Sequence, residues 1–339
     1  MSAAAVSFDG PEERPVLEVE RLSVDYLSRS GTVRAVDDVS FTLHRGEILG
    51  LAGESGSGKS SLITALLRLQ RPPAITSAGR VTLHRDAEQP VDLLTLTERQ
   101  LRGLRWTRMS IVMQSAMDAL NPVKRLGAQF VDVLRTHDRS LSKAAAVALA
   151  AEFLELAGIP GERLSAYPHE MSGGMRQRAL IALALACRPD VVVMDEPTTA
   201  VDVVMQRSIL SKVLDLQRQL GFAVIFVTHD LSLLLELADR VAIMYAGRLV
   251  EVGPAAELYR DPKHPYTQAL RDSFPPLHAP LTELHGLPGS PPDLRQPAKG
   301  CRFAPRCPRA YDACRHDDPQ PITIGTTEVS CLLHSGAAE

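Results

Sequence analysis

One short stretch limits the possible folds of this chain more than any other. Positions 53–60 read Gly-Glu-Ser-Gly-Ser-Gly-Lys-Ser and fit the spacing G-x-x-x-x-G-K-S. The run 47–52 before them, apolar from Ile48 on, predicts a buried strand, and the run from Lys59 to about Leu69 predicts a helix. A strand, a glycine-rich turn and a helix in this order are typical of an open α/β sheet, with the turn at the carboxyl end of the strand.

The loop is predicted to hold the phosphates of a nucleotide. Its glycines let the backbone curl so that N–H groups face the β-phosphate, while Lys59 neutralises the β and γ oxygens and Ser60 offers its hydroxyl to Mg²⁺. An ordinary glycine-rich turn is the alternative, and the flanking strand and helix argue against it. The residues expected to bind ATP here are Gly53, Ser55, Gly56, Ser57, Gly58, Lys59, Ser60 and Ser61.

Polar residues also follow two other predicted strands. The apolar run 191–194 precedes Asp195 and Glu196, so both carboxylates come at the carboxyl end of a strand, beside the loop. Asp195 is expected to hold the Mg²⁺ shell, and Glu196 to polarise the attacking water. His229 follows the apolar run 223–227, where it can donate a hydrogen bond to the γ-phosphate and contact the catalytic carboxylate.

A second phosphate-recognising turn lies between the loop and the acidic strand. Ser172, Gly173, Gly174 and Met175 stand at the start of a predicted helix that begins near Met175. Backbone N–H groups and the positive end of a helix dipole favour an anion at such a place. Two turns of this kind and one acidic strand indicate a site that a second subunit completes.

Composition excludes several other classes of protein. The 339 residues are 45% hydrophobic with a formal net charge of −3, which favours a substantial core and argues against coating nucleic acid by bulk electrostatics. The first residues lack the basic and apolar regions of a signal peptide, and no apolar run approaches the ~20 residues of a membrane helix. We therefore expect a cytoplasmic protein that reaches a membrane only through partners.

Changes in composition divide the chain into segments. We expect a flexible N-terminus over 1–15, an ATPase domain over 16–260 with a helical subdomain at about 115–186, and a Cys- and Pro-rich extension over 261–339. Within the ATPase domain, the Ala-rich run 143–156 predicts a helix, and the run 241–252, with Gly247 at its centre, predicts a hairpin.

These motifs in this order resemble the nucleotide-binding subunit of ATP-binding cassette (ABC) transporters over roughly residues 16–260. The resemblance implies a RecA-like core, an antiparallel β subdomain and a helical subdomain that carries the Ser172–Met175 signature. It also implies two ATP molecules held between two head-to-tail domains, with Ser172 and Gly174 on the partner's γ-phosphate and Asp202 linking the two sites. Gln114 would sense Mg²⁺ and water and meet the membrane partner, and Tyr26 would stack on adenine.

Two features resemble the peptide-importer branch of that family. Met175 replaces the glutamine that many members carry, in the form Ser-Gly-Gly-Met-Arg-Gln-Arg, and residues 264–270 read His-Pro-Tyr-Thr-Gln-Ala-Leu. The resemblance implies an ATP-driven importer of di- or oligopeptides on the cytoplasmic face of the membrane. Its partners would be a second ABC ATPase (itself or a related chain), two permease subunits and an extracytoplasmic substrate-binding protein, with no nucleic acid.

Other functions remain open at this point. A soluble ABC ATPase that acts on nucleic acid or ribosomes is the main alternative, although the chain shows neither a long coiled-coil insertion nor a second cassette. A regulatory module that only binds ADP is less compatible with Glu196 and His229. Within transport, nickel complexes or glutathione are alternative cargoes.

Four cysteines cluster in the C-terminal extension, at Cys301, Cys307, Cys314 and Cys331. Their spacing differs from the C-x-x-C pairs of common zinc ribbons and is compatible with a 4Fe–4S cluster. Zinc, or thiols without a metal, are the alternatives, with His316 and His334 near enough in sequence to substitute as ligands. Cys187 is expected to fill core space.

Overall fold

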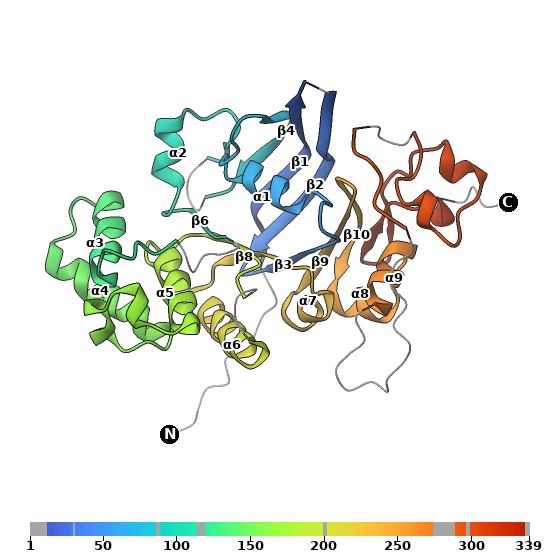
Figure 1. The fold of residues 1–339 in the computed structure, drawn as a ribbon. Helices are drawn as coiled ribbons and strands as arrows, with labels where there is room; N and C mark the ends of the chain where they lie inside the picture. Colours follow the sequence, from blue (N-terminus) through green and yellow to red (C-terminus); the bar gives the residue numbers. More distant parts are fainter. Residues whose placement is uncertain are drawn as a thin grey trace.

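The computed structural model describes residues 12–29, 31–85, 89–113, 119–198, 202–273, 289–295 and 299–335. Two sheets organise them (Figure 1). The larger sheet has the strand order β11-β12-β10-β9-β3-β8-β7-β6, and the smaller has the order β2-β1-β4-β5. This mixed α/β architecture confirms the predicted fold class.

The centre of the larger sheet is parallel and buried on both faces. Neighbouring strands run parallel from β9 to β6, namely β9 (Arg240–Tyr245), β3 (Ile48–Ala52), β8 (Ala223–Val227), β7 (Val191–Asp195) and β6 (Met109–Val112). Alternate residues of β8 enter two different cores: Val224 and Phe226 pack into one, and Ile225 and Val227 into the other. Because both faces are covered, these strands are mostly apolar rather than alternating.

The smaller sheet is antiparallel and closes the second core. It consists of β1 (Glu12–Ser28), β2 (Gly31–Arg45), β4 (Ala74–Leu83) and β5 (Val91–Asp92). Apolar residues of β1, such as Leu17 and Leu22, pack in the same core as Leu62 and Leu66 of the helix α1. The helix that follows the glycine-rich loop is therefore enclosed between the two sheets.

Most of the remaining helices cover the other face of the larger sheet (Figure 1). The α-helices are α1 (Lys59–Leu66), α2 (Glu98–Leu104), α3 (Leu126–His137), α4 (Lys143–Leu156), α5 (Gly173–Leu185), α6 (Val203–Leu220), α7 (Leu231–Leu237), α8 (Ala255–Arg260) and α9 (Pro265–Asp272). Short 3₁₀ turns are η2 (Gly161–Ser165), η3 (Pro168–Glu170), η4 (Ala304–Arg306), η5 (Asp312–Arg315) and η6 (Leu332–His334). Among the helices that the structure describes, none is both long and apolar enough to span a bilayer.

Several predicted elements are confirmed with small shifts. The helix at 143–156 has the predicted bounds because Ser142 caps it, its hydroxyl accepting from the Ala145 N–H at 3.1 Å. The predicted hairpin is β9 paired with β10 (Arg248–Pro254), with Gly247 at φ 89° in the turn. The helix after the glycine-rich loop ends at Leu66 rather than Leu69, since Arg68 takes φ 49°, a left-handed conformation.

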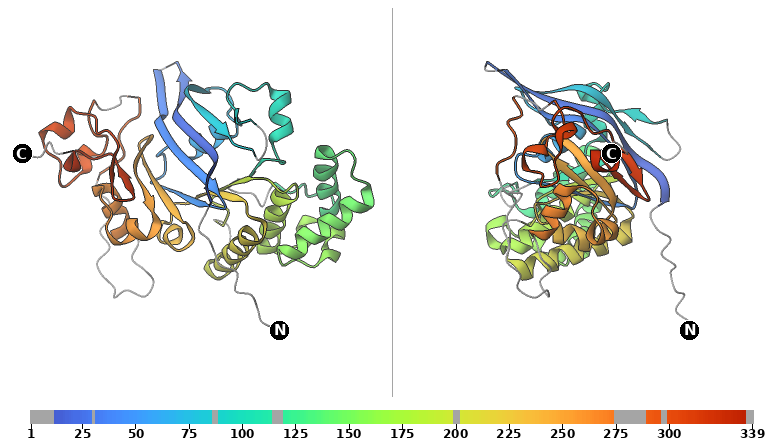
Figure 2. Two further views of the ribbon diagram at one scale, coloured as in Figure 1. Left: turned by 180° about the vertical axis from the view of Figure 1, so that it is seen from behind. Right: turned by 90° about the vertical axis from the view of Figure 1, so that its right-hand side faces the viewer.

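The C-terminal extension joins the larger sheet at its edge. Its hairpin, β11 (Ile322–Ile324) with β12 (Thr327–Val329), pairs antiparallel with β10. Figures 1 and 2 show the extension and the helices α3 and α4 at opposite ends of the molecule. The division at about 260, predicted from composition, thus falls within a structure whose two parts share one sheet.

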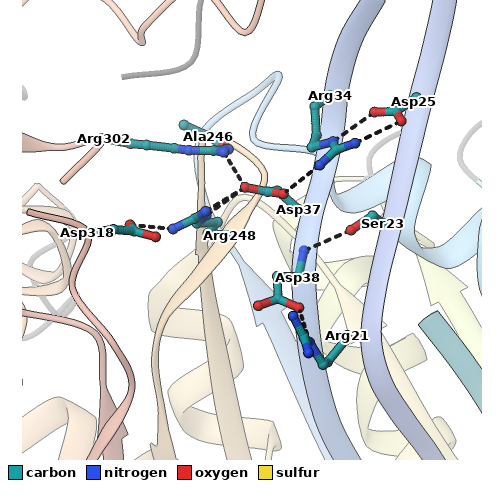
Figure 3. A network of polar contacts seen from close by, with 10 residues as sticks. All are labelled: Arg21, Ser23, Asp25, Arg34, Asp37, Asp38, Ala246, Arg248, Arg302 and Asp318. Atoms are coloured by element: carbon teal, nitrogen blue, oxygen red, sulfur yellow. Dashed lines mark hydrogen bonds and ion pairs between the residues drawn. The ribbon is translucent and has the colours of Figure 1, made fainter. Parts of the chain in front are cut away.

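An ionic network ties the extension to the smaller sheet (Figure 3). Asp37 on β2 accepts from Arg302 of the extension and from Arg248 of β10, whose Nη2 is 2.7 Å from the Asp37 carboxylate. Arg34 lies 3.4 Å away, and Arg248 also contacts Asp318. Charges from three parts of the chain therefore meet on one carboxylate, whose side chain is 10% exposed.

Candidate nucleotide site

The candidate site lies where three parallel strands end side by side. Residues that follow β3, β8 and β7 meet there because Leu51 of β3 aligns with Val227 of β8, and Val227 aligns with Asp195 of β7. The resulting cavity has a volume of about 430 Å³. Its walls are Ala35, Ser55, Gly56, Gly58, Lys59, Ser60, Ser61, Asp195, Glu196 and His229.

Two glycines give the loop its path. Gly53 takes φ +150°, and a Cβ there would lie 2.1 Å from the backbone oxygen of Met244. Gly58 takes φ +107°, and a Cβ there would lie 2.2 Å from the backbone oxygen of Ala35. Any side chain at either position would force the backbone apart, so the loop stays next to β9 and β2 only with glycine at both.

Lys59 is folded back onto its own loop. Its Nζ donates to the carbonyl oxygens of Gly53 at 2.7 Å and Glu54 at 3.0 Å. Burial lowers the pKa of the Lys59 ammonium, and the charges of Glu196, Asp195 and Glu54 oppose that shift. The Ser57 hydroxyl lies 3.4 Å from Nζ as well. A buried cation held by neutral oxygens alone gains strongly from an anion, which matches the predicted contact with phosphate oxygens.

Asp195 and Ser60 meet across the site, as a Mg²⁺ site requires. The Asp195 carboxylate accepts a hydrogen bond from the Ser60 side chain. Burial and the neighbouring Glu196 raise the pKa of Asp195, while Lys59 and the hydrogen bond lower it. A carboxylate and a hydroxyl are oxygen ligands of the kind that Mg²⁺ takes together with phosphate oxygens and water. The two predicted metal-binding residues are therefore adjacent and chemically suited to the ion.

Glu196 is held in an unusual backbone conformation beside His229. It takes φ 46°, in the left-handed region, and its N–H donates to the Val227 oxygen at 2.9 Å. Its carboxylate lies 3.2 Å from Nδ1 of His229. Strained backbone of this kind persists where the surrounding structure requires it, often at active sites. The structure thus brings together the carboxylate and the histidine that the sequence places 33 residues apart.

The signature turn caps the helix that it precedes. Ser172 precedes α5, and its hydroxyl accepts from the Met175 N–H at 3.3 Å, so the helix begins at Gly173 rather than near Met175. Gly174 is buried, and a Cβ there would lie 2.4 Å from Sδ of Met205 on α6. Asp202 caps α6 and accepts from the Met205 N–H at 2.9 Å. The predicted trans-acting residues are therefore linked through α6, and none of them lines the cavity.

Two other residues predicted from the sequence, Tyr26 and Gln114, are not among the described walls of the cavity. Tyr26 lies on β1, and its hydroxyl is 3.1 Å from the Ser61 hydroxyl, so it reaches the helix after the loop. It is absent from the described walls of the cavity, and its stacking on adenine stays a prediction. Gln114 lies outside the described residues, one position beyond Met113, after β6.

The structure adds site residues that the motifs do not predict. Arg306 of the extension forms an ion pair with Glu54 inside the loop, and the Tyr266 hydroxyl accepts from the Glu54 N–H. Glu54 occupies a variable position of the loop pattern, and Arg306 stands among prolines and cysteines. In the sequence, the only hint of these contacts is the tyrosine of the 264–270 segment. Nothing in that segment indicates that this tyrosine contacts the loop.

The four C-terminal cysteines converge on one small cavity together with His264 and Phe303. All four are free thiols. Burial raises the pKa of Cys301 to about 11 and also raises that of Cys307 and Cys331. Across the described residues, no three His, Cys, Asp or Glu side chains are grouped so as to hold a metal ion. Cys187 packs against the main core, as predicted, and burial raises its pKa to about 11.

Two family descriptions match this chain. The ABC transporter family matches residues 36–199, which include the loop, the signature and the acidic strand. The C-terminal region of oligopeptide/dipeptide transporters matches residues 250–314. The second match covers Tyr266 and Arg306 as well as three of the four clustered cysteines.

Curated relatives extend over nearly the whole chain. It is 42% identical to the dipeptide transport ATP-binding protein of Bacillus subtilis over 96% of both chains. It is 41% identical to the oligopeptide transport ATP-binding protein of the same organism, over 95% of this chain and 90% of that one. A solved dimeric bacterial ABC transporter cassette, 22% identical, superposes with a TM-score of 0.61 over 70% of this chain and 98% of its own.

Proposed function

This chain belongs to the ABC transporter family and is an ATPase of that family, and from that premise we propose that it drives a peptide importer. ATP binding between two such chains would close the pair, and hydrolysis would reset it. The observation that carries the proposal is that one chain combines the cassette with the oligopeptide/dipeptide C-terminal region. Di- or oligopeptides are the cargo class that the relatives' names support.

The geometry of the site supports the chemical step. Asp195 and Ser60 would hold Mg²⁺ with the ATP phosphates, and Lys59 would leave the loop carbonyls to meet the β and γ oxygens. Glu196 would orient and deprotonate the attacking water, with His229 beside it to contact the γ-phosphate. Gln114, which lies outside the described residues, would complete the metal and water contacts.

The site also implies partners. Ser172, Gly173, Gly174 and Met175 lie away from the cavity of their own chain, which fits a role in the site of a second ATPase subunit, with Asp202 between the two sites. We further propose that two permease subunits hold the pair at the cytoplasmic face of the membrane. An extracytoplasmic substrate-binding protein would deliver the peptide.

Reconstitution tests this proposal directly. The chain is co-expressed with two permease subunits and a binding protein of a peptide importer, and the purified complex is placed in proteoliposomes. We expect uptake of labelled di- or oligopeptides that requires ATP, the binding protein and Glu196. Uptake of nickel complexes or glutathione in place of peptides would show that the chain drives import of a different cargo. ATPase activity that depends on DNA or ribosomes would overturn the proposal.

We also propose that the four thiols hold a 4Fe–4S cluster. Cys301, Cys307, Cys314 and Cys331 line a single small cavity, and none is used in a disulfide. Among the described residues no three such side chains are grouped so as to hold a metal ion, so the proposal rests on the number and spacing of the cysteines and on the cavity that they share. A 4Fe–4S cluster is held by four thiolates and accepts varied spacing of the cysteines along the chain.

Spectroscopy of anaerobically purified protein distinguishes the alternatives. A cluster gives brown protein with broad visible absorption and about four iron atoms per chain. Replacing Cys314 with serine should remove the colour, whereas replacing Cys187 with serine should leave it. Colourless protein with one zinc per chain, or with neither metal, would contradict the proposal.

A further inference from the structure

The C-terminal extension contacts the phosphate loop at Glu54. The Arg306 guanidinium donates two hydrogen bonds to the Glu54 carboxylate, at 2.7 Å (Nη1 to Oε2) and 2.9 Å (Nη2 to Oε1). The Arg306 side chain is 5% exposed, and the fork-shaped contact fixes direction as well as distance. A residue inside the loop is therefore anchored by a side chain from the far end of the sequence.

The backbone of Glu54 is held as well. Its N–H donates to the Tyr266 hydroxyl at 2.9 Å, and its carbonyl accepts from Lys59 at 3.0 Å. Tyr266 has no exposed surface and packs against the rings of Tyr245 and Phe303, with centroids 4.6 Å and 5.4 Å away. Because side chain, N–H and carbonyl of Glu54 all have partners, the loop starts from a defined conformation.

The part of the extension that contains Arg306 also lines the cavity shared by the four C-terminal cysteines. Arg306 directly precedes Cys307, and Phe303 follows Cys301 by two positions. Phe303, Cys301 and Cys307 all line that cavity. One short segment, residues 299–310, thus contacts the thiols on one side and holds the phosphate loop on the other.

We propose that Arg306 and Tyr266 are positioning residues that pre-form the phosphate loop for ATP, so that nucleotide affinity depends on the conformation of segment 299–310. A loop that binds phosphate through backbone N–H groups binds best when those groups already point at the ligand. Coupling of this kind is reciprocal, so ATP must in turn stabilise the segment. The state of the four thiols would then influence the ATPase through the arginine next to Cys307.

Binding measurements on the full chain test the first half of this proposal. We expect Arg306→Met and Tyr266→Phe each to weaken binding of ATP with Mg²⁺ by about tenfold in titration calorimetry. A double-mutant cycle of Arg306→Met with Glu54→Gln should be strongly non-additive, because both changes break one contact. Arg315→Met is the matched control, since Arg315 is an exposed arginine beside Cys314.

Hydrogen exchange tests the reciprocal half. Adding ATP with Mg²⁺ should slow amide exchange in segment 299–310 of the unmodified chain, and this slowing should disappear in Arg306→Met. A merely structural attachment would lower thermal stability without changing ATP affinity. The proposal fails if Arg306→Met and Tyr266→Phe are folded by circular dichroism, bind ATP within about twofold of the unmodified chain, and show no ATP-dependent change in exchange.

Discussion

Single residues at the nucleotide site combine function with strain. Glu196 takes a left-handed backbone conformation, Lys59 is buried against carbonyls, and Asp195 is buried next to another carboxylate. Each of these arrangements costs stability in the absence of ligand and is relieved, or used, when ATP and Mg²⁺ arrive. Substitutions of these residues should therefore change both ATP turnover and the stability of the chain.

Replacing Glu196 by glutamine should separate binding from hydrolysis. The amide keeps the shape of the side chain but cannot take a proton from water, so we expect turnover to fall by roughly 10²–10⁴-fold with ATP binding retained. Steady-state ATPase rates and equilibrium ATP binding measure the two effects. Glu236→Gln, an exposed glutamate on α7, is the control. Hydrolysis at the unmodified rate would show that Glu196 is not the base.

Asp195 should make stability depend on pH in a defined direction. Burial and the adjacent Glu196 raise its pKa, so the folded chain keeps this proton to higher pH than the unfolded chain does. The free energy of unfolding then falls as the pH rises from the ordinary carboxyl pKa through the raised pKa of Asp195. Above the raised pKa the loss of stability is complete. Asp195→Asn should accordingly raise the melting temperature of nucleotide-free protein near neutral pH and weaken Mg²⁺-dependent ATP binding.

Thermal scans at two pH values check this prediction. The increase in melting temperature caused by Asp195→Asn should be present at about pH 7 and shrink toward about pH 4, where the native side chain is protonated. Asp317→Asn, which removes an exposed carboxylate, should change neither melting temperature appreciably. A lower melting temperature for Asp195→Asn at neutral pH would show that its ionised form stabilises the fold.

At the scale of elements, the signature helix depends on close contact with its neighbour. Gly174 lets α5 approach Met205 on α6, while Ser172 and Asp202 cap the two helices. Serine and aspartate are favoured before a helix because their side-chain oxygens accept backbone N–H groups there. The sequence does not indicate that the glycine faces a methionine, because that contact depends on how α5 and α6 pack.

Gly174→Ala should destabilise the chain by overpacking. The added Cβ would lie 2.4 Å from Sδ and 2.8 Å from Cγ of Met205, and insertion of this kind costs about 1–3 kcal/mol. Combining it with Met205→Ala should recover part of the loss, measured by denaturant unfolding. Gly103→Ala is the control, because an exposed helix position with nothing within 4 Å should instead gain up to about 1 kcal/mol. Equal effects of the two alanines would refute the packing explanation.

At the scale of the whole molecule, one buried carboxylate joins three parts of the fold. Burial alone would raise the pKa of Asp37, but the hydrogen bond and charge of Arg248, with the charges of Arg302 and Arg34, lower it overall. Figure 3 shows the side chains from β2, β10 and the extension meeting at this point. The extension is therefore attached by charge as well as by the β10–β12 strand pairing.

Asp37→Asn should destabilise the chain strongly near neutral pH. Removing one member of a buried ionic network leaves Arg302 without the carboxylate that it contacts, at a cost of about 3–5 kcal/mol. Because the folded pKa of Asp37 is depressed, its contribution is present above the ordinary carboxyl pKa and is lost as the pH falls through the folded pKa. Denaturant unfolding at about pH 7 and about pH 3 should show the difference between variant and unmodified chain shrinking in acid.

The neighbouring residue offers a matched control. Asp38 pairs with Arg21 at 2.9 Å, but both side chains are largely exposed, at 52% and 81%. Asp38→Asn should therefore cost less than about 1 kcal/mol. If both variants lost similar stability, the buried network would not be what holds the extension.

The sequence by itself determined the order of chemical groups and the strands that carry them. A loop with this glycine spacing, acidic residues after an apolar run and a histidine after another can meet only where parallel strands end together, and they do so in the structure. Local rules also predicted α4 and the β9–β10 hairpin, because an Ala-rich helical run and a turn glycine act over a few residues.

Tertiary structure alone decided how the extension meets the site. Glu54 and Arg306 are separated by 252 positions, and no period or spacing connects them. Likewise, the four cysteines are recognisable as a group, but only folding shows that they share a cavity beside Phe303 and a loop that reaches the phosphate site. Contacts of this kind depend on which surfaces pack together, and packing is a property of the whole chain rather than of any local pattern.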